Sequence, residues 1–301
     1  MGICDGRVVI VTGAGRGIGR GHAIEFARQG AKVVVNDLGG AVDGSGSDLT
    51  PAEQVVEEIN GFGGEAVANA DNIADWEGAQ RLVNTAIETF GDLHVLVNNA
   101  GILRDRMLVN MTEEEWDAVI NVHLKGTFAP ARWAAAYWRE RTKEGKTNDA
   151  RIINTSSASG LYGNPGQTNY AAAKAGIAAF TIVASKELAR YGVTVNAIAP
   201  GARTRMTENL GLGAITVEEG KFDAFAPENI APLVVWLGSA NSKDVTGRVF
   251  NVAGGRISVA EAWHSGPGQD KGDRWEPAEL DDIVPKLVAD AQPNPDMQGN
   301  I

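Results

Sequence analysis

Short apolar segments rich in β-branched residues alternate along the chain with longer segments that have a helical pattern. Alternating strands and helices are typical of a parallel sheet with right-handed crossovers. The pattern therefore predicts an α/β fold: one doubly wound, parallel, seven-stranded sheet with helices on both faces and ligands at the carboxyl ends of its strands. The expected strands are Arg7–Thr12, Lys32–Asp37, Glu65–Ala70, His94–Asn98, Arg151–Thr155, Thr194–Ala199 and Arg248–Val252.

Two predicted helices are long. The helix near Glu113–Arg141 begins with Thr112 and Glu115, which have the spacing of a capping box. The helix near Asn169–Tyr191 is rich in alanine and other small residues.

Two regions depart from this alternation. The glycine-rich segment Leu38–Pro51 is expected to form a mobile loop. From about Val259 the chain becomes rich in proline; Pro277 suits the first turn of a helix, which Pro285 would kink or split. We therefore predict one domain over residues 1–258 and a C-terminal extension over residues 259–301.

The composition of the chain limits the classes of molecule that it is expected to bind. The 301 residues include 27 basic and 38 acidic side chains, a net charge of −11, which argues against nucleic acid and anionic membranes and favours small molecules. Cys4 is the single cysteine and the four histidines are isolated, so no disulfide or metal site is predicted. Neither a leader segment nor a long apolar run is evident, and we expect a soluble cytoplasmic protein.

A glycine-rich turn, Thr12–Gly19, joins the first predicted strand to the next helix. Gly13 permits a sharp turn, while Gly17 and Gly19 let backbone amides and the helix N-terminus approach a pyrophosphate. The spacing differs from Gly-x-Gly-x-x-Gly because position 18 is Ile18. We predict a Rossmann-type dinucleotide site rather than a turn kept only for packing, and assign to it Gly13, Gly15, Arg16, Gly17, Ile18 and Gly19.

Asp37 ends the second predicted strand and is followed by Leu38. A carboxylate at this position can accept both ribose hydroxyls of an adenosine and would repel a 2′-phosphate. Asp37, with Leu38 beside it, therefore favours NAD as the cofactor.

Tyr170 and Lys174 are one helical turn apart, so both side chains leave the same helix face. Alone, this pair is more often an exposed polar face than a site. Ser157 precedes Tyr170 by thirteen positions, and Asn121 lies on an earlier predicted helix. Together with the glycine turn, these residues resemble the short-chain dehydrogenase/reductase family.

The resemblance implies that Tyr170 is a general acid/base in hydride transfer between an alcohol or ketone and a nicotinamide. Tyrosine normally holds its proton too tightly, with a pKa of about 10, and Lys174 with the positive nicotinamide would lower that pKa. Ser157 would hold the substrate oxygen, and the spacing favours it over its neighbour Ser156. Asn121 would interrupt its helix, and a carbonyl there would bind a water on the lysine relay.

The resemblance also extends the cofactor site. The segment after the third strand would meet the adenine, although a turn or capping aspartate is the alternative. Asn-Asn-Ala-Gly after the fourth strand would flank the ribose, and Pro-Gly after the sixth would border the nicotinamide. Thr204 is one residue off the family's usual threonine, and Arg16 keeps NADP open. The added residues are Asp71, Asn72, Ile73, Asn99, Ala100, Gly101, Pro200, Gly201 and Thr204.

Over roughly residues 3–258 the chain resembles more closely the dehydrogenase part of the peroxisomal multifunctional enzymes of type 2. The segments that carry the likeness are Val34–Gly40, Gly101–Arg106, Thr155–Asn164 and Arg205–Glu208. The likeness implies NAD-dependent oxidation of (3R)-3-hydroxyacyl-CoA esters or 17β-hydroxysteroids. An NADP-dependent 3-oxoacyl thioester reductase and a catalytically silent dinucleotide-binding sensor or scaffold remain alternatives.

Two further expectations concern partners. Two arginine pairs, Arg104 with Arg106 and Arg203 with Arg205, suit the phosphates of coenzyme A, or else join salt bridges. The family usually packs its two long helices against symmetry mates, which implies a homodimer or homotetramer.

Overall fold

The computed structural model describes residues 2–39, 50–203, 220–261 and 263–301. In this part of the chain the strands form one sheet in the order β3-β2-β1-β4-β5-β6-β7-β8. All pairs from β1 to β7 are parallel, as predicted. The strands are β1 (Val8–Thr12), β2 (Lys32–Asn36), β3 (Glu65–Asn69), β4 (Val95–Asn98), β5 (Ala150–Thr155), β6 (Val193–Gly201), β7 (Val249–Ala253) and β8 (Arg256–Ala260).

The eighth strand corrects the prediction of seven. β8 runs antiparallel to β7, and Ala253 pairs with Arg256 across a two-residue turn. Gly254 in that turn has φ +54°, a left-handed conformation that glycine adopts at little cost. A Gly-Gly pair between two short apolar segments is a hairpin signal, so the sequence did contain the information.

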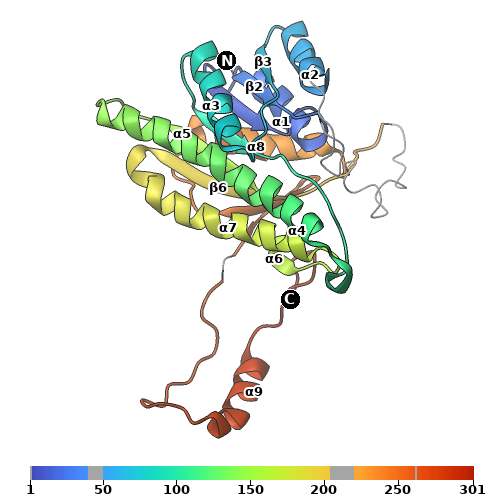
Figure 1. Cartoon of the computed structure of the whole chain (residues 1–301), viewed down its shortest axis with the longest axis vertical. Helices are drawn as coiled ribbons and strands as arrows, with labels where there is room; N and C mark the ends of the chain where they lie inside the picture. Colours follow the sequence, from blue (N-terminus) through green and yellow to red (C-terminus); the bar gives the residue numbers. More distant parts are fainter. Residues whose placement is uncertain (1, 40–49, 204–219, 262) are drawn as a thin grey trace.

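Helices bury both faces of the sheet (Figure 1). On one face, α1 (Gly17–Arg28), α2 (Thr50–Gly61) and α8 (Ala231–Gly238) pack on strand residues such as Val9 and Val33. On the other face, α3 (Trp76–Phe90), α5 (Gly126–Lys143) and α7 (Thr168–Leu188) pack on residues such as Ile10 and Leu96. Neighbouring positions of a strand thus supply opposite cores, as the period of two requires.

The predicted helix Glu113–Arg141 is interrupted. It consists of α4 (Glu113–Ile120), a π-helical turn, η2 (Asn121–Lys125), and α5. The capping box is present, because Glu115 N–H donates to Thr112 Oγ1 (3.2 Å) and Thr112 N–H donates to Glu115 Oε2 (3.0 Å). The Gly126 N–H donates to the Asn121 carbonyl, the i to i+5 bond of a π turn. Such turns are often found at functional sites.

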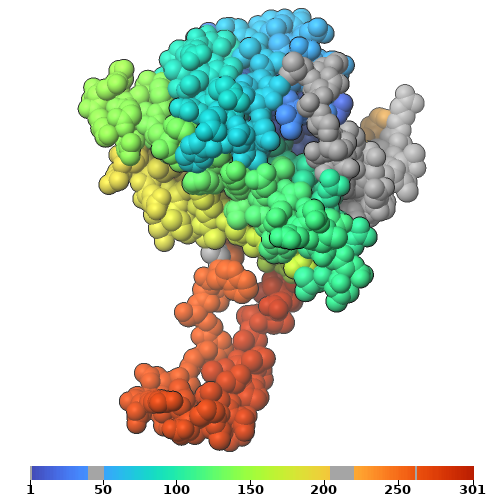
Figure 2. All heavy atoms as spheres, viewed as in Figure 1, coloured from blue at the N-terminus to red at the C-terminus, as the bar shows by residue number. Residues whose placement is uncertain are grey.

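The chain beyond β8 stands away from the main body and returns towards it at its end (Figure 2). It contains a 3₁₀ turn, η8 (Pro277–Glu279), and α9 (Leu280–Asp290). Pro285 lies inside α9, so of the two effects expected there, a kink or a split, the split does not occur. β8 itself crosses the predicted boundary at residue 258. Among the helices described, none is long and apolar enough to cross a membrane.

Candidate active site

The glycine turn after β1 is built for a close backbone approach. Gly13 has φ +63°, and a Cβ there would lie 2.7 Å from the Ala100 Cα. A Cβ at Gly15 would lie 2.8 Å from Asp37 Oδ2. Arg16 is the N-cap of α1 in an extended conformation and offers no side-chain acceptor to the first turn. The first-turn amides of α1 therefore suit a pyrophosphate, and pyrophosphate binding there stays a prediction.

Hydrogen bonds connect the segment after β4 to this turn. Thr12 Oγ1 accepts hydrogen bonds from the backbone N–H groups of Asn99 (3.0 Å) and Ala100 (3.1 Å). Asn99 Nδ2 donates to the carbonyls of Thr12 (3.0 Å) and Gly13 (3.2 Å). The structure thus brings Asn99 and Ala100 to the glycine turn across the two adjacent strands β1 and β4.

Asp37 lies at the edge of the same turn. Its Oδ2 accepts from Gly15 N–H (2.8 Å) and its Oδ1 from Gly39 N–H (2.8 Å). These bonds fix the carboxylate beside the glycine turn, and each oxygen keeps a lone pair that can accept a further donor. Leu38 follows, 38% exposed. A ribose diol fits this arrangement.

The predicted adenine segment is tied to other groups. Asp71 Oδ1 accepts from Arg81 Nε (2.7 Å) and Asp71 Oδ2 from Asn69 Nδ2 (2.9 Å). Asn72 Oδ1 accepts from the Ala74 N–H (2.9 Å), and Ile73 is buried. These bonds support the alternative of a turn aspartate, and an adenine contact stays a prediction.

The catalytic side chains meet at the carboxyl end of β5. Ser157 is the N-cap of α6 (Ala158–Tyr162), where its hydroxyl accepts from the Ser159 N–H (3.2 Å), and it lies near enough to Tyr170 to lower the pKa of the phenol. Lys174 follows Tyr170 by one turn of α7, and its Nζ lies 5.4 Å from the centre of the Tyr170 ring. The Lys174 ammonium donates to the Thr155 carbonyl (2.6 Å). Ser157, Tyr170 and Lys174 are therefore brought together, as predicted from their spacing.

Ser156 has a different role from its neighbour. It is 1% exposed, and its hydroxyl donates to the Lys174 carbonyl (2.8 Å). Gly160 also allows α6 to pack closely on α7, because a Cβ there would lie 2.6 Å from the Lys174 Cβ. Ser156 thus anchors the helix, which leaves Ser157 as the serine beside Tyr170.

Burial shifts the pKa of both ionisable groups. It raises the pKa of Tyr170 to about 12, with a hydrogen bond from Ser157 opposing the rise and the charge of Asp105 adding to it. Burial also lowers the pKa of Lys174 to about 7. Both shifts have the same cause, which is that removing a charged form from water is costly. Shifted groups in close contact are typical of functional sites.

Within the described residues, the side chain of Asn121 forms no hydrogen bond with these three residues, and a water held by the carbonyl there stays a prediction. Its residue is exposed at the start of η2, and its carbonyl is used by the Gly126 N–H. The nearby side chain is instead His123, which is 1% exposed and lies edge-on to Tyr170, with ring centres 5.0 Å apart. The sequence pattern favoured a surface or core histidine without a role in the site at His123. It does not indicate which side of this helix faces Tyr170.

The segment after β6 is described in part. Pro200 and Gly201 pair with Val252 and Ala253 at the carboxyl end of the strand. This placement agrees with a border of the nicotinamide site. Thr204 lies outside the described residues.

The arginine pairs have acidic neighbours. Arg106 binds Glu115 through two nitrogens, with the shortest distance, Nη2 to Oε1, at 2.7 Å. Arg203 forms an ion pair with Asp223. Arg205 lies outside the described residues. These contacts favour the salt-bridge alternative for Arg106 and Arg203.

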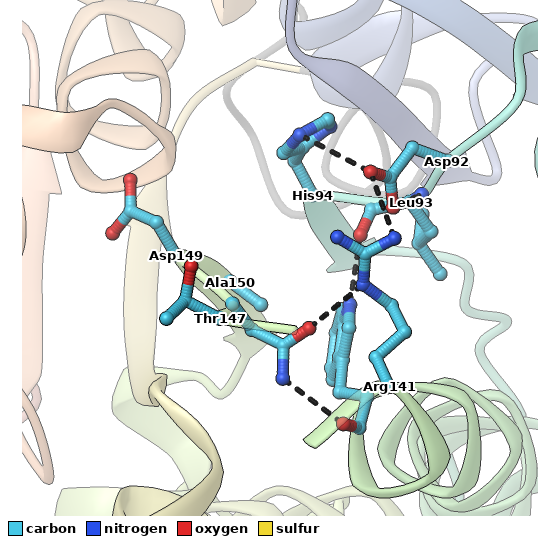
Figure 3. Close-up of a pocket in the computed structure, with 9 residues that line it drawn as sticks. Asp92, Leu93, His94, Arg141, Thr147, Asp149 and Ala150 are labelled. Carbon is cyan, nitrogen blue, oxygen red and sulfur yellow. Dashed lines mark hydrogen bonds and ion pairs between the residues drawn. The ribbon is translucent and has the colours of Figure 1, made fainter. Parts of the chain in front are cut away.

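A cavity of about 220 Å³ lies at the opposite, amino end of the strands (Figure 3). Figure 3 shows the Arg141 guanidinium pointing towards Asp92, an ion pair of 3.3 Å. Asp149, also in its lining, is held by Arg7 (2.7 Å) and Arg151 (2.5 Å). Its charged groups thus satisfy one another, so the cavity offers no chemistry that competes with the site at Tyr170. Among the described residues no cluster of His, Cys, Asp or Glu could hold a metal ion.

Known proteins resemble this chain in sequence and in fold. The chain matches the family model for short chain dehydrogenases over residues 7–213. It is 46% identical over 283 residues to the hydroxyacyl-CoA dehydrogenase ChsB1 of Mycobacterium tuberculosis, which covers 92% of this chain and 86% of that protein. It is 46% identical over 253 residues to the mouse peroxisomal multifunctional enzyme type 2, which covers 84% of this chain but only 32% of that longer protein.

A crystal structure of a short chain dehydrogenase from Mycobacterium avium superposes with a TM-score of 0.87 at 60% identity, covering 97% of this chain and 98% of that one. The chain therefore belongs to the short-chain dehydrogenase family. It is an oxidoreductase of CH–OH groups that uses a nicotinamide cofactor. The resemblance stated from the motifs is confirmed.

Proposed function

We propose that this protein is an NAD-dependent dehydrogenase that oxidises the secondary alcohol of a 3-hydroxyacyl-CoA, or a related alcohol, with Tyr170 as general acid/base. The observation that carries the proposal is that the Lys174 ammonium lies 5.4 Å from the centre of the Tyr170 ring, one helical turn away, with Ser157 near the phenol and at the same sheet edge as the glycine turn. No other described part of the chain combines a phenol, a buried ammonium and a backbone anion site.

The residues present suit a nicotinamide dinucleotide. The first turn of α1 would hold the pyrophosphate, Asp37 the ribose diol, and Pro200 with Gly201 the nicotinamide end. When bound, the cofactor accepts or donates the hydride.

The chain's own groups move the proton. In the oxidation, Ser157 donates a hydrogen bond to the substrate oxygen and holds it at Tyr170. The tyrosinate form of Tyr170 takes the hydroxyl proton as the hydride leaves the carbinol carbon, so a ketone remains. Lys174, whose Nζ lies 5.4 Å from the ring centre, stabilises the tyrosinate through its positive charge. In the reduction, the proton returns from Tyr170 to the oxygen.

The substrate class rests on the relatives. One is named a hydroxyacyl-CoA dehydrogenase, and this name supports an acyl-CoA. The 17β-hydroxysteroid reading stays a second candidate from the resemblance, whereas the intact Ser157, Tyr170 and Lys174 weigh against a silent sensor or scaffold.

Steady-state kinetics with NAD and NADP on a 3-hydroxyacyl-CoA, a CoA-free 3-hydroxy ester and a 17β-hydroxysteroid test the proposal. We expect NAD to exceed NADP in kcat/KM by about tenfold or more, and Asp37→Ala to shrink that ratio because it removes the repulsion of a 2′-phosphate. An NADP preference would favour the 3-oxoacyl thioester reductase, which Arg16 keeps open. Best turnover of the steroid would replace the acyl-CoA assignment.

We also propose a homodimer or homotetramer and a cytoplasmic location. Apolar side chains are exposed on the long helices, Phe128 at 44% on α5 and Val183 at 53% on α7. Next to Phe128, the rings of Trp76 and Trp133 and the guanidinium of Arg132 stack at the surface. Light scattering at micromolar concentration should give a mass of two or four chains, and a mass of 31.7 kDa would contradict the assembly.

A further inference from the structure

His123 occupies a protected position beside the catalytic tyrosine. Its imidazole is 1% exposed and lies at 89° to the Tyr170 ring, with the ring centres 5.0 Å apart. On another side the imidazole lies against the backbone of Gly101, where a Cβ would overlap the His123 Cε1. A glycine at 101 is therefore needed for the imidazole to be there.

His123, and not Asn121, faces the tyrosine from η2. Two residues along a helix correspond to a rotation of roughly 200°, so the two side chains point to nearly opposite sides. Asn121 is exposed and His123 is buried accordingly. Consistent with this, α4 and η2 both pack on α7, the helix that carries Tyr170.

The hydrogen bonds of His123 fix its ring. Nε2 lies 2.8 Å from the Ile102 carbonyl oxygen and 3.1 Å from the Ile102 nitrogen. One nitrogen can serve only one of them, and the shorter contact is the one in which Nε2–H donates to the carbonyl. Nδ1 is buried without a protein partner among the described residues. A proton on Nδ1 would thus be a buried donor with no acceptor, which is costly.

His123 also adds no charge to the site. Burial lowers its pKa to about 3, with the charge of Lys174 acting in the same direction. A neutral imidazole does not compete with Lys174 for the tyrosinate. Its contacts on three sides are the Tyr170 ring, the Gly101 backbone and the Ile102 carbonyl.

We propose that His123 is a positioning residue, whose neutral Nε2–H imidazole clamps the Gly101–Ile102 backbone against the edge of the Tyr170 ring and so holds the phenol at Ser157. This inference rests on the proposed function of Tyr170 as general acid/base. It places His123, and not the side chain of Asn121, against the ring of Tyr170.

The clamp is tested with paired substitutions. His123→Ala should lower kcat by about a hundredfold, the scale of a catalytic group misplaced by about 1 Å, while KM for the alcohol and NAD affinity change less than about threefold. His123→Gln places an amide nitrogen near the position of Nε2 and should recover most of kcat. Asn121→Ala should lower kcat less than His123→Ala does.

His22 provides the matched control. It is an equally buried histidine on α1, with a pKa that burial likewise lowers to about 3. His22→Gln tests the general cost of replacing a buried imidazole and should leave kcat near the wild-type value in the folded fraction. Three results would each overturn the proposal. The first is a wild-type kcat in folded His123→Ala, and the second is a kcat in His123→Gln that stays as low as in His123→Ala. The third is a larger loss of kcat in Asn121→Ala than in His123→Ala.

A readout without turnover separates this inference from the proposed function. Nitrogen-15 spectra of the histidine rings should show His123 neutral and protonated at Nε2 from pH 5 to pH 8, because its pKa is about 3. Titration of His123 in that range, or a proton on Nδ1, would refute the clamp even if the enzyme is active. If Tyr170→Phe keeps full activity, the proposed function fails while the spectra still decide the clamp geometry.

Discussion

The charged side chains at the two ends of the sheet differ in their partners. At the amino end, Arg7 and Arg151 both bind Asp149. At the carboxyl end, Lys174 is 2% exposed, and the hydrogen bond of its ammonium is to a carbonyl. Paired charges stabilise a fold, whereas a buried cation that lacks a carboxylate partner has a shifted pKa and is available for chemistry.

The pKa values follow this difference. Burial raises the pKa of Asp149, but hydrogen bonds and charges from Arg7 and Arg151 outweigh burial and hold that pKa below its usual value. Burial alone lowers the pKa of Lys174 to about 7. The amino end therefore keeps its charges at neutral pH, and the carboxyl end can lose or gain a proton there.

The largest expected effect is on stability at the amino end. Arg151 is 1% exposed, and its Nε donates to Ser239 O and Ser242 Oγ, both at 3.1 Å. Arg151→Met breaks these bonds and the pair with Asp149, and should lower the free energy of unfolding by about 3 kcal/mol. Urea denaturation measures the loss.

The control for that change is Arg139→Met. The pair of Arg139 with Glu140 is exposed on both sides, so its loss should lower the free energy of unfolding far less than the Arg151 change does. The folded Arg151→Met variant should keep the wild-type kcat. A large loss of kcat at unchanged stability would mean that the amino end takes part in catalysis and that the comparison is wrong.

The opposite result is expected for Lys174→Met. Turnover should fall by about a hundredfold, the scale of a lost contribution to general acid/base catalysis. The folded pKa of Lys174, about 7, is below the 10.5 of an ordinary lysine, so the unfolded chain binds more protons between these values. Burying the lysine therefore costs free energy at pH 7, and this cost disappears as the pH rises towards 10.5.

Removing the lysine also removes its hydrogen bond to the Thr155 carbonyl. Beyond that loss, the substitution should raise the free energy of unfolding more at pH 7 than at pH 10. Denaturation of wild type and Lys174→Met at the two pH values measures this difference. A variant that is equally destabilised at both would show that Lys174 is charged and well paired in the fold.

Much of this contrast was accessible from the sequence. β-branched segments of five or six residues predicted β1 to β7, and the spacing of Ser157, Tyr170 and Lys174 predicted the catalytic group. The sequence did not predict features that depend on a single helix turn or on ion pairs between residues far apart in the chain. The π turn decides between Asn121 and His123, and no periodicity indicates it.

Long-range pairs were equally inaccessible. Asp149 meets Arg7 from 142 positions away, and the partner of Arg106 lies on the following helix. Charge pairs of this kind depend on how the loops pack, which the hydrophobic pattern does not specify. The missed strand β8 is different, since its Gly-Gly turn was visible in the sequence.

The smallest expected effect concerns Asp105, whose charge raises the pKa of Tyr170. Asp105→Asn can still accept the hydrogen bond from Gln167 Nε2, which is 2.8 Å in the wild type. Without the negative charge the tyrosinate is easier to form, so the rise of the oxidation rate with pH should move to lower pH. The pH dependence of kcat/KM measures the shift.

Asp117→Asn serves as control, because it removes an exposed acid of α4 while leaving the site unchanged. Its profile should superpose on that of the wild type. A shift of the Asp105→Asn profile to higher pH would contradict the sign of the Asp105 effect.

The central claim is that Tyr170 transfers the proton, and Tyr170→Phe tests it most directly. Phenylalanine keeps the ring that lies against His123 and removes the hydroxyl whose pKa Ser157 lowers. The single-turnover rate of alcohol oxidation with saturating NAD should fall by about a hundredfold or more, while NAD affinity stays within about twofold. A phenylalanine variant that binds NAD normally and retains most of the wild-type rate would contradict the account.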